Sequence, residues 1–354
     1  MKQNNYHIIG VMSGTSLDGI DLAELQFSVS EKGVWSFEIG ISETVAYSTI
    51  WKNNLQEAIS YSIEKMKGFN KEYTAYLGEI ILEFINRNDL KNIDAVCSHG
   101  HTIWHQPKEI LTLQIGNLPK IASIINQKVI CDFRVQDVAL GGNGAPLVPI
   151  GDRLLFKEYD YCLNLGGFAN ISFELEGKRI AYDVCPVNIV LNSFAEKLGF
   201  PFDEGGKFAE KGNVNKKLFQ QLNKLQYYQE NSPKSLGLEW VQEKIFPIIE
   251  ASEISILDKI ATFTEHVAFQ LANNFEESSS VLVTGGGTFN FYLLQRIQFY
   301  KKLELIVPSK KIIENKEALI FGLLGVLKLR NEVNCLASVT GAVRDHSSGI
   351  VFKP

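Results

Sequence analysis

The segment Gly10–Asp21 constrains the fold more than any other, because it joins two apolar runs through a turn of small polar residues. The apolar residues of 6–11 predict a buried strand, and those of 20–27 predict a strand that returns beside it. Glycines in the turn allow positive φ angles and close backbone approach, and its hydroxyl groups can donate to an anion. These residues are Gly14 and Gly19, with Ser13, Thr15 and Ser16. The pattern is typical of a phosphate-binding turn, although the same residue types also build ordinary hairpin turns.

Two more glycine-rich turns follow apolar runs later in the chain. Residues 161–173 predict a second strand–turn–strand, and residues 281–290 predict a strand that enters a glycine turn before a helix near Phe291. The polar and glycine positions at these turns are Asn164, Gly166, Gly167, Asn170, Gly285, Gly286 and Gly287. Neither a Walker motif nor Gly-x-Gly-x-x-Gly occurs, so a P-loop or Rossmann protein lacks its main support. Three such loops are typical of a nucleotide held by two half-domains.

Several blocks of the sequence resemble the bacterial anhydro-N-acetylmuramic acid kinases, which belong to the actin-like ATPase and sugar kinase superfamily. The blocks occur in the family's order and extend over nearly the whole chain. They comprise residues 10–21, 98–105, 113–116, 132–134, 141–149, 163–171 and 338–342. Long blocks in the right order make the resemblance highly specific, whereas any single block would not be.

This resemblance implies an α/β protein with a two-domain, actin-like (ribonuclease H-like) sugar kinase fold and an interdomain cleft. The implied domains are residues 1–135 plus 314–354, with a C-terminal helix that returns to the first domain, and residues 136–313. The implied activity is that of an ATP-dependent kinase of cell-wall (murein) recycling. Such an enzyme opens 1,6-anhydro-N-acetylmuramic acid with water and phosphorylates the freed 6-oxygen, which yields N-acetylmuramic acid 6-phosphate.

ATP and Mg²⁺ are the cofactors that the resemblance implies. In the first turn the residues expected at the nucleotide are Gly14, Thr15, Ser16, Leu17, Asp18, Gly19, Ile20 and Asp21. The residues expected at the nucleotide in the other two turns are Gly166, Gly167, Asn170, Gly285, Gly286 and Gly287. Asp18 and Asp21 are candidate ligands of the Mg²⁺ ion, because carboxylates are the protein groups that this ion prefers.

Asp183 and Glu317 are the candidate catalytic carboxylates. Attack of water on an anomeric carbon needs a carboxylate base, and Asp183 follows an apolar step and precedes a helix predicted over residues 188–198. By the resemblance Asp183 falls on the family's general base, in a block that reads Asp-Thr-Gly-Pro-Gly-Asn in the family and Asp-Val-Cys-Pro-Val-Asn here. The loss of both glycines puts the backbone path in doubt. From local sequence alone, Asp183 could be a turn or capping residue and Glu317 a helix N-terminal glutamate.

The expected substrate residues surround a histidine-rich block and a following arginine. They are His99, His101, Thr102, Arg134, Asp137 and Asn188. Arg134 could grip the lactyl carboxylate of the sugar through its guanidinium, or form a structural salt bridge with Asp137. Lys234 also matches a family block, but an exposed loop lysine is the simpler interpretation.

Three other interpretations stay open. The spacing of His99, His101 and His105 allows a metal site, which would favour a metal-dependent glycan hydrolase. The three glycine turns alone would also suit an ATP-dependent conformational regulator of the actin type. The altered block after Asp183 leaves open a kinase for a related amino sugar.

Composition sets the remaining expectations. With 45% hydrophobic and 21% charged residues the chain is an ordinary globular protein, and its net charge of −5 predicts no nucleic-acid partner. The five cysteines are odd in number and widely spaced, which favours reduced core residues over disulfides. No apolar stretch is long enough to span a membrane and no leader pattern begins the chain, so we expect a cytoplasmic enzyme with a small-molecule amino sugar substrate. A homodimer stays open.

Overall fold

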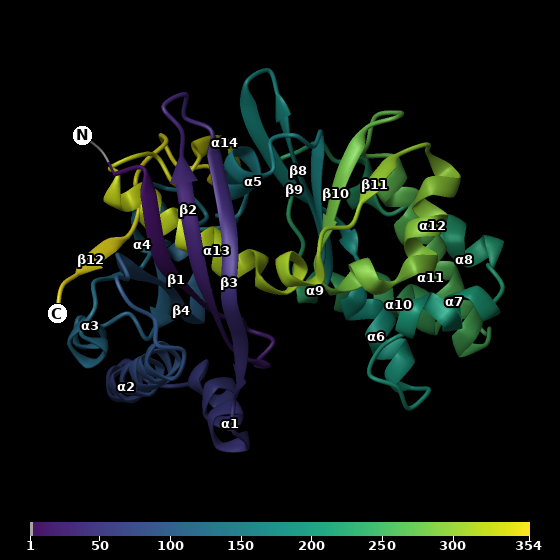
Figure 1. The fold of residues 1–354 in the computed structure, drawn as a ribbon. Helices are drawn as coiled ribbons and strands as arrows, with labels where there is room; N and C mark the ends of the chain where they lie inside the picture. Colours follow the sequence, from purple (N-terminus) through teal and green to yellow (C-terminus); the bar gives the residue numbers. More distant parts are fainter. Residues whose placement is uncertain (1–2) are drawn as a thin grey trace. The chain divides into compact units, whose positions relative to one another are not determined.

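The computed structural model describes residues 3–354, which form two compact units (Figure 1). Unit 1 extends to Leu155 and resumes over Asn315–Pro354, and unit 2 comprises Phe156–Glu314. The chain therefore passes from one unit to the other after Leu155 and again inside the helix α13, Lys310–Leu329.

Unit 1 is built on a mixed sheet of seven strands. Its strands are β1 (Asn5–Ser13), β2 (Gly19–Val29), β3 (Trp35–Ala46), β4 (Ala95–Gln106), β5 (Leu111–Ile115), β6 (Val129–Cys131) and β12 (Ile350–Phe352). Its helices are α1 (Thr49–Ala58), α2 (Ile63–Arg87), α3 (Lys120–Ile125), α4 (Val135–Ala139), α5 (Pro149–Leu155), most of α13, and α14 (Ala337–Thr340). The strand order is β12-β6-β4-β1-β2-β3, and β5 pairs with β4.

Unit 2 is built on a sheet of five strands. Its strands are β7 (Tyr161–Leu165), β8 (Phe168–Leu175), β9 (Lys178–Pro186), β10 (Ser280–Thr284) and β11 (Glu304–Ile306). Its helices are α6 (Asn188–Glu196), α7 (Lys207–Lys211), α8 (Lys216–Asn223), α9 (Leu238–Trp240), α10 (Phe246–Glu250), α11 (Ile256–Ala272) and α12 (Phe291–Tyr300).

The two sheets share one topology. In unit 1, β1, β2 and β3 form an antiparallel meander, and β4 and β6 add in parallel on the other side of β1. In unit 2, β7, β8 and β9 form the meander, and β10 and β11 add in parallel beside β7. With the additional strands β5 and β12 of unit 1 left aside, each unit therefore has the strand order third-second-first-fourth-fifth, which is the ribonuclease H-like order. The predicted two-part α/β fold is confirmed, and the cleft between the parts stays a prediction.

Alternation along β1 supplies two faces of the unit 1 sheet. Ile9 and Val11 join the core formed with α2 and are completely or almost completely buried. Gly10 points to the opposite face, where a Cβ atom would lie 2.3 Å from the carbonyl oxygen of Ala318 in α13. A Cβ atom at Gly322 of α13 would likewise overlap Leu25 of the sheet, and one at Gly325 would overlap Cys97. The absence of side chains at these glycines allows α13 to pack directly on the strands.

The boundary between the units differs from the expected division after residue 135. Residues 136–155 belong to unit 1, because their charged side chains are tied to its C-terminal part. Asp152 of α5 makes a buried ion pair of 2.9 Å with Lys316, and Asp137 of α4 accepts a hydrogen bond of 2.7 Å from Thr340. These two contacts hold the segment to a part of the chain that lies far away in sequence.

The remaining elements agree with several sequence expectations. The helix predicted over residues 188–198 is α6 and ends at Glu196, and the expected C-terminal helix is α13, Lys310–Leu329. All five cysteines are buried and free, as expected for core residues. In the described part of the chain, no helix is both long and apolar enough to cross a membrane.

The close contact at Gly10 makes a prediction for stability. We expect Gly10→Ala to lower the free energy of unfolding by about 1–3 kcal/mol, because the added methyl group overlaps the backbone of α13. Urea unfolding followed by circular dichroism measures the change. Gly68→Ala in α2 is the control: its Cβ atom meets nothing within 4 Å, and alanine favours a helix by about 1 kcal/mol. Equal effects of the two substitutions would contradict the packing argument.

Candidate active site

A row of polar residues crosses the sheet of unit 2 near the ends of its first strands. Thr284 of β10 is paired in register with Asn164 of β7, which is opposite Asn170 of β8. Asn170 is in turn opposite Asp183 of β9. Three residues singled out from the sequence thus become neighbours, because directly opposed residues of an antiparallel pair point to the same face.

The register between β8 and β9 shifts beside Asp183, so that Val184 has no partner on β8. An extra residue of this kind bends a strand and changes the direction of the neighbouring side chain. Val184 is 1% exposed and enters the core, whereas Asp183 is only half-buried. The irregularity therefore separates an apolar position from the adjacent carboxylate.

Asp183 is fixed through its backbone and through one carboxylate oxygen. Oδ2 accepts a hydrogen bond of 2.9 Å from the backbone N–H of Leu236, and Tyr227 Oη donates to the Asp183 carbonyl at 2.6 Å. Oδ1 makes no hydrogen bond to a residue of the described chain, so it can accept a proton from a bound molecule. Burial raises the pKa of Asp183, and the Leu236 N–H opposes that shift.

Lys234 lies beside this segment and is partly buried rather than fully exposed, contrary to the simpler interpretation. Its Nζ donates to the carbonyl of Tyr227 at 3.1 Å and lies over the Tyr227 and Tyr182 rings. Its backbone carbonyl accepts from the N–H of Asp183. Lys234 therefore helps to hold the backbone around the carboxylate.

The turn between β7 and β8 rests on the start of α6. The carbonyl of Gly167 accepts from the N–H of Val187 at 2.8 Å, and that of Gly166 accepts from Asn188 at 3.3 Å. Asn188 Nδ2 donates to the carbonyl of Leu165 at 3.3 Å. Asn188, which was expected at the substrate, thus connects the end of β7 to the start of α6 through its side-chain hydrogen bond.

The third glycine turn requires glycine at its first position. Gly285 has a φ angle of +84°, and a Cβ atom there would lie 2.7 Å from the carbonyl of Leu165. Asn290 begins α12, as its side chain accepts from the N–H of Leu293 at 3.0 Å. A second pair of glycines, Gly205 and Gly206, also has positive φ angles, and Gly206 contacts Asn290. This pair was not among the glycines singled out from the sequence, although its Gly-Gly dipeptide was a visible signal.

The turn of unit 1 obtains its shape differently from the expectation. Neither Gly14 nor Gly19 has a positive φ angle, and Leu17 adopts one of 61° instead. Gly19 is required by packing, since a Cβ atom would lie 2.5 Å from the carbonyl of Val45 in β3. The side chains of Thr15, Ser16 and Asp18 remain exposed at the turn.

Ser13, the last residue of β1, anchors this turn through a buried network that the sequence analysis did not find. Its Oγ lies 2.6 Å from Tyr47 Oη, 2.8 Å from His101 Nδ1 and 3.1 Å from Tyr73 Oη. Burial raises the pKa of Tyr47 to about 12 and that of Tyr73 well above its usual value, so both phenols stay neutral. Ser13 was expected only as a hydroxyl donor of the turn and His101 only at the substrate, and no sequence pattern pointed to Tyr47 or Tyr73 as their partners.

The histidines of β4 lie on opposite faces of the sheet, which corrects the expectation of one histidine cluster. Gly100 has a φ angle of +71°, and the register of β4 against β1 shifts at this point. His101 therefore contacts Tyr47 and Tyr73, whereas His99 packs against Phe321 of α13 at 4.6 Å. The exposed His105 bonds Thr112. A metal site made from these three histidines, and the hydrolase that it would imply, have no support in the described residues.

Arg134 is positioned by His99 and by the loop before α5. Its Nε donates to His99 Nε2 at 2.9 Å, and its Nη1 donates to the carbonyl of Gly144 at 2.7 Å. His99 Nδ1 in turn lies 2.8 Å from the carbonyl of Gly100, which makes His99 a neutral acceptor for the guanidinium. Burial lowers the pKa of His99 well below its usual value, with the charge of Arg134 as the second cause.

Glu317 lies in the electrostatic field of Arg134. Partial loss of hydration raises the pKa of Glu317, the positive charge of Arg134 lowers it, and Asp21 raises it. The Glu317 side chain nevertheless keeps access to solvent. Asp21 itself accepts a hydrogen bond of 2.6 Å from Thr44. Unit 1 therefore carries a mixed-charge group of two carboxylates and one guanidinium.

Asp137 is buried instead of being accessible to a substrate, whereas the expected role of Thr102 stays a prediction. Asp137 is 0% exposed, and its carboxylate accepts from the N–H of Gly144 and from the hydroxyl of Thr340, each at 2.7 Å. It therefore braces a loop and the C-terminal segment, and it forms no salt bridge with Arg134. Thr102 accepts a long hydrogen bond of 3.4 Å from Gln114 within the sheet.

Sequence comparison settles the family. The family described as anhydro-N-acetylmuramic acid kinase matches residues 6–354. The chain belongs to the anhydro-N-acetylmuramic acid kinase family. The predicted resemblance is thereby confirmed.

Curated members of this family match the chain over almost its whole length. The anhydro-N-acetylmuramic acid kinase of Sulfurimonas denitrificans is 30% identical over 98% of this chain and 99% of the relative. That of Saccharophagus degradans is 31% identical over 98% of both. That of Coxiella burnetii is 31% identical over 97% of this chain and 96% of the relative.

The solved structures that align with this chain are less similar to it in sequence than the curated relatives are. A ligand-bound xylulose kinase of Lactobacillus acidophilus aligns with 99% of this chain and 94% of its own, at a TM-score of 0.43 and 12% identity. Component A of the (R)-2-hydroxyglutaryl-CoA dehydratase of Acidaminococcus fermentans aligns with 92% of this chain and 99% of its own, at a TM-score of 0.45 and 13% identity.

The buried His101 makes a prediction for the pH dependence of folding in this family member. Burial lowers the pKa of His101 to about 4, below the value near 6.5 of an unfolded chain. Between these two pH values the unfolded chain binds a proton at His101 and the folded protein does not. The free energy of unfolding therefore decreases as the pH falls, by up to about 1.4 kcal/mol per pH unit. We expect His101→Gln to make this loss shallower in urea unfolding at a series of pH values. His105→Gln, on an exposed ring, should change the slope less.

Proposed function

We propose that this chain is an ATP-dependent anhydro-N-acetylmuramic acid kinase that opens the 1,6-anhydro bridge with water and phosphorylates the freed 6-oxygen. The observation that carries the proposal is the family match over residues 6–354. The positions of Asp183 and of the glycine turns on the two sheets support the proposal. The reaction needs a carboxylate base and loops that hold a nucleotide, and these residues can supply both.

Asp183 is proposed as the general base that takes a proton from the attacking water. One carboxylate oxygen is fixed by the backbone of Leu236, which leaves Oδ1 to accept the proton. Partial burial raises the pKa of Asp183, which makes the carboxylate a better proton acceptor. The hydrogen bond from Leu236 also favours the ionised form that the reaction requires.

The residues that replace the two family glycines after Asp183 are compatible with the observed position of this carboxylate. Cys185 and Val187 are both 0% exposed, so their side chains enter the core of unit 2 rather than a ligand site. Neither residue adopts a positive φ angle, so the backbone does not need glycine there. These observations favour the family substrate over a related amino sugar.

Arg134 and Glu317 are proposed as substrate contacts of unit 1. His99 and Gly144 hold two nitrogens of Arg134, which orients the guanidinium for an anionic group such as the lactyl carboxylate. Glu317 retains solvent access near this positive charge and can accept a hydrogen bond from a sugar hydroxyl. Both roles are proposals for residues that the resemblance singled out.

The nucleotide is proposed to contact the glycine turns at residues 14–21, 166–170 and 285–287. Phosphoryl transfer needs positioning and charge neutralisation more than covalent help from the protein. Mg²⁺ keeps most of its coordination for water and phosphate oxygens and uses one or two protein carboxylates. Asp18, exposed at the turn, and Asp21, at the start of β2, fit that modest requirement. When bound, the ion would neutralise phosphate charge.

A substrate comparison in labelled water tests this function. We expect the purified enzyme with ATP and Mg²⁺ to phosphorylate 1,6-anhydro-N-acetylmuramic acid and to leave unbridged N-acetylmuramic acid almost unreacted. In ¹⁸O-water the label should enter the anomeric hydroxyl and not the phosphate, because water attacks C1 while O6 of the bridge attacks the γ-phosphorus. Mass spectrometry of the sugar phosphate locates the label. Preference for the unbridged sugar, or label in the phosphate, would exclude the proposed reaction.

A substitution at Asp183 tests the mechanism. We expect Asp183→Asn to reduce turnover by about 100-fold or more, because the amide keeps the shape but cannot accept the proton. The acidic limb of the pH–rate profile should disappear with it, whereas the calorimetric affinity for ATP should change little. Asp160→Asn is the matched control, since Asp160 is an exposed carboxylate of the same unit that bonds Ser280. Near-normal turnover of the Asp183 variant would assign the base to another carboxylate.

A further inference from the structure

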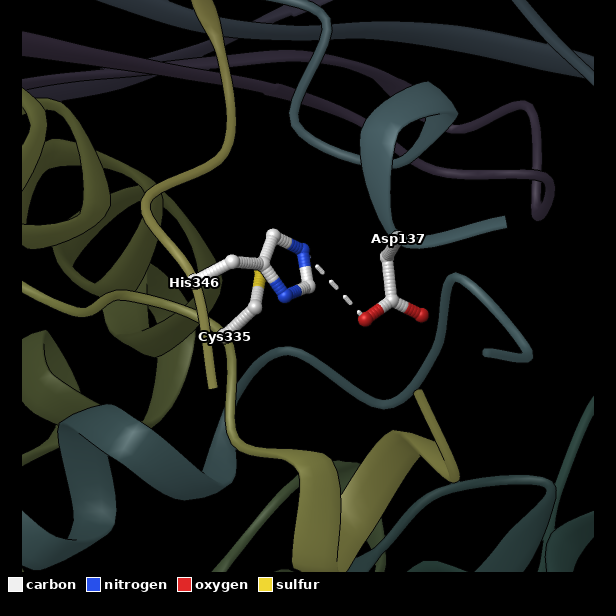
Figure 2. Close-up of side chains that lie close together, drawn as sticks. All are labelled: Asp137, Cys335 and His346. Carbon is white, nitrogen blue, oxygen red and sulfur yellow. Dashed lines mark ion pairs between the residues drawn. The ribbon is translucent and has the colours of Figure 1, made fainter. Parts of the chain in front are cut away.

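Asp137, Cys335 and His346 form a buried cluster that contains none of the residues assigned to the reaction, although Arg134 lies within electrostatic range of it. One potential ligand atom from each lies within 4.8 Å of the other two, and it is the one such group of three or more in the described chain. The exposed fractions of the three residues are 0%, 1% and 6%. Figure 2 shows the sulfur of Cys335 beside the imidazole of His346, with the Asp137 carboxylate facing the ring.

The backbone places two of these side chains next to each other. Cys335 and His346 form an isolated antiparallel bridge and exchange two N–H to carbonyl hydrogen bonds, of 3.1 and 3.2 Å. Directly opposed residues of such a pair point to the same side. Asp137 comes from α4 and is held by Gly144 and Thr340, so all three groups have fixed supports.

If His346 is neutral, no proton lies between its ring and the carboxylate of Asp137. His346 Nδ1 lies 3.2 Å from the carbonyl of Arg344, and only a protonated Nδ1 can bond a carbonyl. In the neutral ring Nε2 then carries a lone pair, which faces Asp137 Oδ1 at 3.5 Å. Nε2 is buried and has no hydrogen-bond partner in the described structure. Two acceptors that face each other out of water are unfavourable, so either the ring carries a second proton on Nε2 or a metal cation lies between the two groups.

We propose that Asp137, Cys335 and His346 bind a divalent transition-metal ion, with zinc as the best match. Thiolate, imidazole and carboxylate are the three ligand types that zinc uses. Metal–ligand bonds of about 2.0–2.3 Å place the ligand atoms of a tetrahedral ion roughly 3.3–3.8 Å apart, which agrees with the separation of Nε2 from Oδ1 and requires the sulfur to move by about an ångström at most.

The hydrogen bonds around the proposed ligands are also typical of a metal site. A ligating histidine usually donates its other N–H to a carbonyl or carboxylate, as Nδ1 of His346 does to Arg344. The Cys335 thiol would bind as the thiolate and release its proton to solvent when the ion binds. The ion would link the segment 335–346 to α4, and a water molecule would complete four-coordination. Its role would be structural, since all three ligands are buried.

Cobalt substitution and metal analysis of the full-length protein test this site. We expect about one zinc ion per chain by elemental analysis after dialysis against metal-free buffer. Protein refilled with Co²⁺ should show thiolate-to-cobalt charge-transfer absorption and the intense visible bands of a tetrahedral ion. Cys335→Ser should abolish the charge-transfer band, and His346→Gln should lower the zinc affinity by at least 10-fold. Chelation should lower the melting temperature of the parent protein and leave that of both variants unchanged.

Two matched variants separate this site from the other candidate ligands. Cys162→Ser removes a buried cysteine of unit 2, and His105→Gln removes a histidine of the β4 motif. Both should keep the zinc and the cobalt spectrum. A protein that takes up neither ion, or one whose cobalt spectrum survives Cys335→Ser, would overturn the proposal and leave His346 Nε2 as a hydrogen-bond donor to Asp137. These readouts do not depend on the kinase activity.

Discussion

The pairing of an antiparallel meander with a parallel strand beside its first member organises both units. In unit 1 this arrangement joins β1 to β2 and β4, and in unit 2 it joins β7 to β8 and β10. Each first strand is therefore central in its sheet and ends in a tight glycine-containing turn. Polar groups from the neighbouring strands are brought to the same edge, because the register of the hydrogen bonds aligns them.

Departures from regular strand geometry give the candidate site its detailed form. The register shift beside Asp183 separates the carboxylate from the buried Val184, and the positive φ angle of Gly100 sends His99 and His101 to opposite faces. His99 is consequently available to orient Arg134, and His101 is available to anchor Ser13. Two histidines that are close in sequence thus perform unrelated tasks.

The family resemblance and the two-part α/β fold could be predicted from the sequence, whereas the strand order came only from the structure. Asp183, Asn170 and Asn164 were singled out separately, but their alignment in one row required the registers of two strand pairs. Asp137 illustrates the opposite outcome. It was expected at the substrate, and it is completely buried because its carboxylate satisfies the N–H of Gly144 and the hydroxyl of Thr340.

The sequence by itself determined the elements whose signals are local: apolar alternation in the strands, apolar spacing in the helices, and glycines where the backbone must turn sharply. Only the tertiary structure decided which polar groups meet, because Ser13, Tyr47 and His101 come from distant segments, as do Asp137, Cys335 and His346. The energy of a buried polar group depends on the partner that it finds. That partner is set by strand register and helix packing, which no local pattern records.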